Sequence, residues 1–271
     1  MAIRDVLVYT DNDGNCQSRV LCAAKICHHF GAHLTGLYAL RMLAVHPYPY
    51  TYLPPGVFET LEAQAKTKSD DAKEKFNADI NGKDISSEFC PIHGDVIEPI
   101  THQTRYADML VVPQQHSSNS ELNPRYQVSS ILLEAACPIL VLPENYSQTL
   151  LPIQRALIAW DGSHECARAL NFALPMLTQV ESVDVLSVST SDKQATNISR
   201  HIARHGIKTN IHLVDDGNSN VGSTLLDQAT SLNSQLIVMG AYGHSRLREE
   251  ILGGTTKYML EHAHLPILYS H

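Results

Sequence analysis

The chain has 271 residues, of which 44% are hydrophobic, and a formal net charge of −8. This hydrophobic fraction suffices for buried cores, while the negative charge argues against a general polyanion-binding role such as coating nucleic acid. The amino-terminal stretch is not signal-like and no window approaches the ~20 apolar residues that span a bilayer, so we expect a cytoplasmic protein without nucleic-acid or membrane partners.

Three apolar runs recur in the same order in the two halves of the chain, which indicates a tandem duplication. The pairs are 6–11 with 156–161, 108–112 with 235–239, and 137–141 with 265–269. A polar stretch bounded by Pro143 and Pro152 separates the repeats. We therefore expect two domains, 1–147 and 152–271, joined by a linker short enough to keep them together.

Apolar runs alternate with helical patterns in each half, which is typical of an α/β fold with a parallel sheet. In the second half the pattern predicts five strands, near 155–160, 183–188, 209–214, 235–239 and 266–270, and four helices, near 163–178, 194–205, 220–233 and 255–264. The first half follows the same order but adds an insertion at 46–55, expected to be a surface loop, before a charged helix at 57–81.

Two glycines follow the predicted strand at 235–239, and two more directly precede the predicted helix at 255–264. They are Gly240, Gly243, Gly253 and Gly254, followed by Thr255 and Thr256. Glycine lets backbone amides approach an anion, and the amides of a helix start carry partial positive charge. The spacing therefore predicts a phosphate site, although the glycines alone are also compatible with a turn and the threonines with a helix cap.

The spacing Gly-x2-Gly-x9-Gly resembles the signature of the universal stress protein family, with Gly254 where serine or threonine is more usual. Residues 156–163 (ALIAWDGS) are similar to the family's first strand, ending in the nucleotide-contacting Asp161, and 265–269 (LPILY) to its last strand. Many members bind ATP. The resemblance implies two tandem doubly wound domains, each a five-stranded parallel sheet of order 3-2-1-4-5, and ATP in the second, with magnesium or manganese bridging the phosphates.

This strand order predicts where the ligand lies. A doubly wound sheet binds ligands outside the carboxyl ends of the strands where the order reverses, which here is between the first and fourth strands. Asp161 ends one and Gly240 ends the other, so both should reach one crevice. Asp161 would contact ribose or adenine, or hold a metal through water. The alternative role for this aspartate is to cap the helix that begins at Ser163.

The first half departs from the signature. Pro113, His116, Arg125 and Tyr126 stand opposite Gly240, Gly243, Gly253 and Gly254, so a donor amide is lost and bulky side chains replace glycine. Asp11 is retained at the end of the first strand, although Asp13 could take its place. We therefore predict that the first half does not bind ATP in the manner of the family.

Other chemistry finds little support in the sequence. The six cysteines are scattered without a Cys-x-x-Cys pair and are expected to be reduced thiols. His201 and His205 stand four apart on a predicted helix, but no convincing further ligands accompany them, so no metal site is assigned. The sequence also lacks the Walker A loop, the Gly-x-Ser-x-Gly elbow and the zinc-protease motif.

The leading hypothesis is an ATP-binding regulatory protein of the stress response, whose second half holds the nucleotide without turnover. Slow ATP hydrolysis or autophosphorylation remains an alternative, as does a nucleotide-independent scaffold or a binder of another small molecule. The family's terminal strands commonly meet across a dimer. We therefore expect 138–142 and 266–270 to pair within the chain as an intramolecular pseudo-dimer, and a homodimer of whole chains is a further expectation.

Overall fold

The protein is described from a computed structural model. The structure describes residues 3–12, 14–40, 56–93, 96–114, 128–144, 146, 150–188, 192–214, 220–243 and 254–271. The predicted surface loop at 46–55 lies outside these residues.

The first half alternates strands and helices as its sequence predicts. Its elements are β1 (Asp5–Thr10), α1 (Cys16–Phe30), β2 (His33–Leu40), α2 (Val57–Ile80), β3 (Ser87–His93), α3 (Ile97–Gln103), a 3₁₀ turn (Thr104–Tyr106), β4 (Met109–Pro113), α4 (Val128–Glu134) and β5 (Ile139–Leu142). The predicted charged helix at 57–81 is confirmed as α2.

The second half repeats this order without the long helix. Its elements are β6 (Arg155–Ala159), α5 (His164–Leu177), β7 (Ser182–Val188), α6 (Asp192–Arg204), β8 (Thr209–Val214), α7 (Val221–Ser231), β9 (Leu236–Gly240), α8 (Gly254–His262) and β10 (Ile267–Ser270). All five strands and four helices expected here are confirmed, with ends that differ by two residues or fewer.

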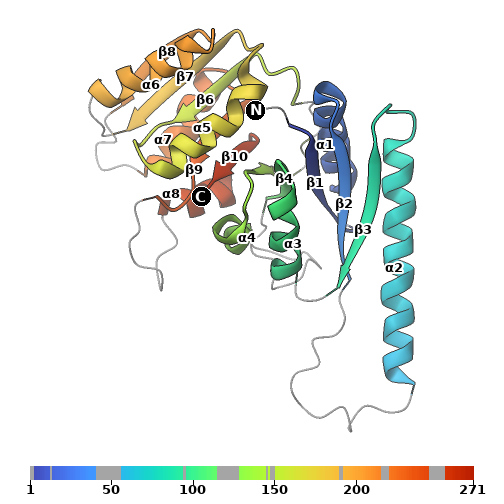
Figure 1. Cartoon of the computed structure of the whole chain (residues 1–271). Coiled ribbons are helices and arrows are strands. Elements are labelled where there is room, and N and C mark those ends of the chain that lie inside the picture. The colour runs from blue at the N-terminus through green and yellow to red at the C-terminus, as the bar shows by residue number, and fades with distance from the viewer. Residues whose placement is uncertain are drawn as a thin grey trace.

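The strands form one sheet of ten, in the order β3-β2-β1-β4-β5-β10-β9-β6-β7-β8. Each half therefore has the predicted order 3-2-1-4-5, and its own strands pair in parallel. β5 and β10 pair antiparallel, with Ile139 opposite Tyr269, and so join the halves at the centre of the sheet (Figure 1). The predicted pairing of the two terminal strands within the chain is confirmed.

A hydrophobic core lies on each face of the sheet, and each core runs through both halves. The core under α1, α2, α5 and α6 contains Val6 and Val8 of β1, and the core under α3, α4, α7 and α8 contains Leu7 and Tyr9. This alternation follows from the two-residue period of a strand. Helices thus cover both faces, as in a doubly wound fold.

Local sequence explains why α5 forms where it does. Its buried side chains recur at the three- and four-residue spacing of one helical face, at Cys166, Ala169, Leu170, Ala173, Met176 and Leu177. The Ser163 hydroxyl caps the first turn by accepting a hydrogen bond from the Cys166 amide. The helix therefore starts directly behind the carboxyl end of β6.

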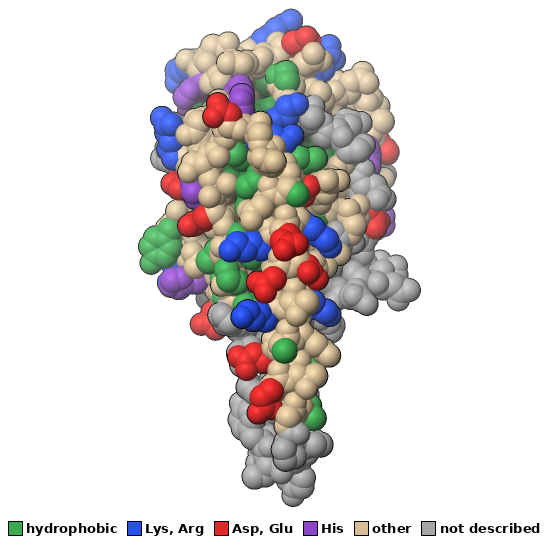
Figure 2. Space-filling model, turned by 90° about the vertical axis from the view of Figure 1, so that its right-hand side faces the viewer, with side chains coloured by type: hydrophobic (Ala, Val, Ile, Leu, Met, Phe, Trp, Pro, Cys, Tyr) green, Lys and Arg blue, Asp and Glu red, His purple; other side chains and the backbone are tan. Residues whose placement is uncertain are grey.

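The long helix α2 lies along the outer side of the first half (Figure 1). Ser69, Ala72 and Phe76 are buried on one face, whereas the remaining turns expose mostly polar and charged side chains. Acidic and basic groups alternate over this exposed surface (Figure 2). Within the described ranges, no helix is both long and apolar enough to cross a membrane.

Candidate functional site

The candidate site lies where the strand order reverses in the second half. β6 and β9 are parallel neighbours, with Ala159 opposite Met239, so the chain leaves both strands at the same edge of the sheet. Asp161 follows the first strand and Gly240 ends the second. The two segments that the sequence predicts to share one crevice are therefore adjacent, although nearly eighty residues separate them.

Asp161 forms the turn that leads into α5. One carboxylate oxygen, Oδ1, accepts a hydrogen bond of 2.9 Å from the Ser163 amide, and Gly162 between them has a left-handed φ of 79°. The helix cap itself is the Ser163 hydroxyl. The cap role considered for Asp161 thus belongs to Ser163, while the partly exposed Asp161 carboxylate borders the crevice.

Gly240, at the end of β9, and Gly243, in the loop that follows, lie against the first turn of α5. A Cβ atom at Gly240 would come within 2.6 Å of the Cys166 backbone nitrogen, so the packing of strand against helix alone requires glycine there. A Cβ atom at Gly243 would lie 3.0 Å from Cβ of Ser163 and from Oε2 of Glu165. The loop after β9 and the start of α5 are consequently in contact.

The second part of the glycine motif opens α8. Gly254 is the first residue of this helix and is exposed, with nothing within 4 Å of a Cβ atom built on it. Thr255 is partly exposed, whereas Thr256 is 4% exposed and its hydroxyl accepts a hydrogen bond of 3.4 Å from the Tyr242 amide. This bond joins both ends of the motif. Gly253, His244 and Arg246 lie outside the described residues.

Three segments therefore come together at this edge of the sheet: the turn at 161–163, the loop at 240–243 and the start of α8. They include the amino ends of α5 and α8, and such ends attract anions. The carboxylates of Asp161 and Glu165 add negative charge beside them, and the Glu165 side chain is 18% exposed. The arrangement suits an anionic ligand that arrives together with a cation.

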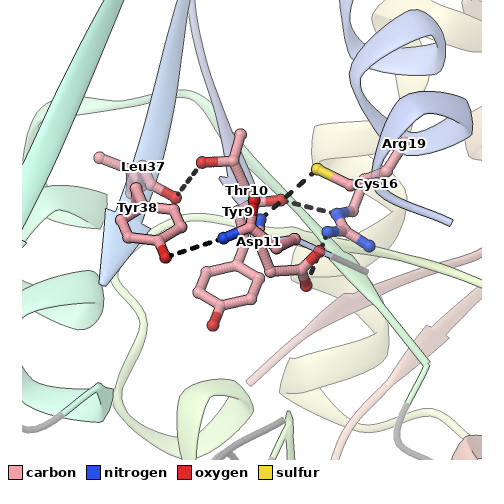
Figure 3. Close-up of polar contacts among 8 residues, drawn as sticks. Tyr9, Thr10, Asp11, Cys16, Arg19, Leu37 and Tyr38 are labelled. Atoms are coloured by element: carbon pink, nitrogen blue, oxygen red, sulfur yellow. Dashed lines mark hydrogen bonds and ion pairs between the residues drawn. The ribbon is translucent and has the colours of Figure 1, made fainter. Parts of the chain in front are cut away.

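The corresponding position in the first half is occupied by the protein itself (Figure 3). Nη2 of Arg19, from α1, lies 2.9 Å from Oδ2 of Asp11, and Nε donates a 2.6 Å hydrogen bond to the Tyr9 carbonyl. The Arg19 side chain is 2% exposed and that of Asp11 is 11% exposed. An internal cation thus neutralises the aspartate that the first half retains.

Neighbouring contacts tie the end of β1 to the rest of the first half. The Thr10 hydroxyl donates to the Leu37 carbonyl (Figure 3). The Asn12 amide group donates to the Tyr38 hydroxyl and to the Lys68 carbonyl of α2. Pro113 ends β4, at the place that Gly240 takes in β9. Asp13, His116, Arg125 and Tyr126 lie outside the described residues.

Sequence reasoning missed three residues at these sites: Arg19, Glu165 and Tyr242. Arg19 stands eight residues after Asp11, and Ala169 stands eight after Asp161, so aligning the halves on their aspartates would have revealed the difference. Burial of an arginine on an apolar helix face is a second signal. Tyr242 carries no sequence signal beyond its place between two glycines.

The histidines and cysteines serve other roles in the described parts of the chain. The rings of His201 and His205 lie 5.0 Å apart, but no group of three or more metal-ligating side chains is found among the described residues. His262 stacks on Tyr258, and Nε2 of His264 lies 2.9 Å from Oγ1 of Thr230. All six cysteines are free, and burial raises the pKa of Cys166 to about 12.

Comparisons with known proteins agree with this architecture. A crystal structure of a universal stress protein from Archaeoglobus fulgidus has a TM-score of 0.79 and 14% identity, over 98% of this chain and 95% of that one. A crystal structure of a universal stress protein from Pseudomonas aeruginosa has a TM-score of 0.61 and 16% identity, over 99% and 93%. At such low identities, these likenesses show the fold.

Sequence matches point to the same family. A universal stress protein of Synechocystis is 28% identical over 138 residues, which are 48% of this chain and 46% of that protein, so the match spans about half of the relative. The family model described as "Universal stress protein family" matches residues 200–271, which include the loop after β9, α8 and β10. The family model, the curated relative and the solved structures thus all relate this chain to universal stress proteins, and its two similar halves are consistent with a tandem arrangement.

Proposed function

We propose that the second half, 152–271, binds ATP in the crevice between β6 and β9, and that occupancy regulates a stress response in the cytoplasm. The observation that carries the proposal is the convergence of Asp161, the loop at 240–243 and the start of α8. Backbone amides around Gly240, Gly243, Gly253 and Gly254 would hold the phosphates. Thr255 and Thr256 would add hydroxyl groups, and Asp161 would contact the nucleoside.

The charges around the crevice support a nucleotide bound with a divalent cation. Asp161 and Glu165 place two carboxylates beside the loop that would hold the phosphates. A triphosphate there would be repelled unless a cation offset part of the charge, and magnesium and manganese prefer such oxygen ligands. Magnesium or manganese held between these carboxylates and the phosphates would supply that charge.

We propose binding rather than turnover at this site. The ionisable side chains described beside the loop at 240–243 include Glu165 and His271, whose Nδ1 lies 3.1 Å from the Ala241 carbonyl. We assign neither of them as a general acid or base. The alternative of a slow ATPase is tested by the phosphate-release measurement below.

The experiment that tests the proposal is calorimetric titration of the purified full chain with MgATP, beside mass spectrometry of small molecules released on denaturation. Gly254→Val is the test variant, because its added side chain meets open space in the protein and would meet the phosphates. Gly14→Val is the matched control, since Gly14 also has nothing within 4 Å but lies in the first half.

We expect one MgATP per chain in the wild type and in Gly14→Val, and at least a hundredfold loss of affinity in Gly254→Val. Unfolding midpoints of all three should agree. Binding unaffected by Gly254→Val would show that the site is misplaced. No binding and no released nucleotide in the wild type would favour a nucleotide-independent scaffold, and phosphate release that disappears in Gly254→Val would favour a slow ATPase.

A further inference from the structure

Tyr242 has a strained backbone in the loop at 240–243. Its φ is +61°, a left-handed conformation that side chains other than glycine and asparagine rarely adopt. A non-glycine residue held in this way costs about 1 kcal/mol or more and persists only where surrounding contacts enforce it. The contacts made by Tyr242 therefore show what fixes the loop.

Those contacts lead to β10, the strand that joins the two halves. The Tyr242 ring meets the ring of His271 edge-on at 6.2 Å, and Nδ1 of His271 lies 3.1 Å from the Ala241 carbonyl. The Ala241 amide donates a 2.9 Å hydrogen bond to the Ser270 carbonyl. The loop is thus fastened to the last two residues of the chain.

The Tyr242 side chain also packs against a hydrophobic core that both halves share. That core includes Val128 and Ile131 of α4 in the first half and Met259 and Tyr269 in the second. The Tyr242 hydroxyl is buried, and no hydrogen bond of ordinary length to it forms among the described residues. Burial raises the pKa of Tyr242 to about 12, and the neighbouring Ser129 side chain at the start of α4 partly offsets this rise.

We propose that Tyr242 is a positioning residue that anchors the candidate phosphate loop in the core shared by both halves, so that the first half presets the geometry of the nucleotide site in the second. This inference rests on the proposed function. It would give the first half, whose Asp11 is paired with Arg19, a role in binding, because the shared core to which α4 contributes would support the loop proposed to hold the phosphates.

The test uses the full chain with three substitutions. Tyr242→Asn tolerates the left-handed backbone but removes the anchoring ring, Tyr242→Phe keeps the ring, and Ser129→Ala changes only the first half. Tyr146→Phe is the control, a buried tyrosine of the first half outside this junction. Each variant is titrated with MgATP and with adenosine, which lacks phosphates, and amide hydrogen exchange of residues 240–243 is measured without ligand.

We expect Tyr242→Asn to weaken MgATP binding about fivefold to tenfold, the cost of ordering a loop that is no longer preset, while adenosine affinity stays unchanged. Tyr242→Phe should bind within twofold of the wild type, and Ser129→Ala should lose about twofold. Faster amide exchange should follow the same order. A purely structural role would instead weaken MgATP and adenosine binding equally.

The outcomes separate this inference from the proposed function. If the wild type binds MgATP and Tyr242→Asn binds it equally well, the inference is overturned and the proposed function stands. If Ser129→Ala matches the wild type in both affinity and exchange while Tyr242→Asn does not, the first half has no part in the anchor. If the wild type binds neither ligand, the proposed function fails, and unchanged exchange in Tyr242→Asn would overturn the anchor as well.

Discussion

Arg19 and Asp11 form a buried ion pair, with 2.9 Å between Nη2 and Oδ2, at the position where the second half has Ala169 and Asp161. The two halves thus keep an aspartate after their first strand and use it differently. In the first half its charge is neutralised by an arginine of the following helix. In the second half the helix has Ala169 at the position of Arg19, and Oδ1 of Asp161 accepts a hydrogen bond from the Ser163 amide.

Replacing Arg19 with methionine should destabilise the protein strongly. The substitution keeps an apolar stem but leaves Asp11 buried without its cation, and removing one partner of a buried ion pair costs about 3–5 kcal/mol. We expect the free energy of unfolding in urea to fall by that amount. Replacing both partners, with Arg19→Met and Asp11→Leu together, should recover most of the loss, because no uncompensated charge remains.

Arg168→Met serves as the matched control for that measurement. Arg168 pairs with Glu165 at 3.4 Å one helical turn away, but its side chain is 52% exposed. Exposed pairs of this kind contribute about 0.5 kcal/mol or less, because solvent screens them. Equal losses for the two arginines would mean that the pair of Arg19 and Asp11 is solvated in solution.

The glycines of the motif should differ in what they contribute to stability. Gly240→Ala places a Cβ atom 2.6 Å from the Cys166 backbone nitrogen, so β9 or α5 must shift, at a cost of about 1–3 kcal/mol. Gly254→Ala meets open space at the start of a helix and should change the free energy of unfolding by less than about 0.5 kcal/mol. Urea unfolding of both variants distinguishes the packing role from the proposed binding role. An unchanged free energy of unfolding in Gly240→Ala would contradict the close contact between Gly240 and α5.

The fold was predictable because its signals are local and repeated. The run at 235–239 and the amphipathic pattern of α5 follow from side-chain periodicity, and the duplication supplied the same order twice. The strand order came from the resemblance to the family. The pairing of β5 with β10 was predictable from the family resemblance and from the apolar edges that these terminal strands leave, whereas its antiparallel direction was not predicted.

The candidate site was less predictable, because its details depend on contacts between distant segments. From the sequence, Gly240 is expected to leave room for an anion. The structure shows that the close approach of the α5 backbone already requires glycine at this position. Thr256 is expected from the sequence to donate to a phosphate, and the structure adds that it is buried and that its hydroxyl accepts a hydrogen bond from the Tyr242 amide. The periodicity of a sequence predicts which side chains face inward, but it does not predict which residues they will contact.

Asp161→Asn should lower the affinity for MgATP without unfolding the protein. The amide oxygen of asparagine can still accept the hydrogen bond from the Ser163 amide, so the turn into α5 is kept, while the charge is lost. We expect about a tenfold weaker binding by calorimetry, the loss of one charge-assisted hydrogen bond.

Asp11→Asn is the matched control for Asp161→Asn, because it removes the same charge from the first half. There the carboxylate faces Arg19, so the substitution should lower the stability of the fold and leave MgATP affinity unchanged. The reverse result, with binding sensitive to Asp11 and insensitive to Asp161, would move the nucleotide to the first half.

Alkaline conditions should destabilise the protein through its buried thiols. Burial raises the pKa of Cys22, Cys27, Cys137 and Cys166 from 9.0 to about 12. Below pH 9 these thiols are neutral in both the folded and the unfolded chain, so their contribution to stability is fully present. Between about pH 9 and 12 the unfolded chain releases protons that the folded chain keeps, so this contribution is lost as the pH rises.

Urea unfolding at pH 8 and pH 10 measures this loss. Each buried thiol contributes up to about 1.4 kcal/mol per pH unit, which makes the free energy of unfolding fall steeply over this interval. Cys22→Ala removes one such group and should reduce the dependence on pH by about one proton, whereas Cys90→Ala, at a partly exposed position, should reduce it less. An unfolding free energy that is independent of pH over this interval would show that the thiols ionise as easily in the folded chain as in the unfolded one.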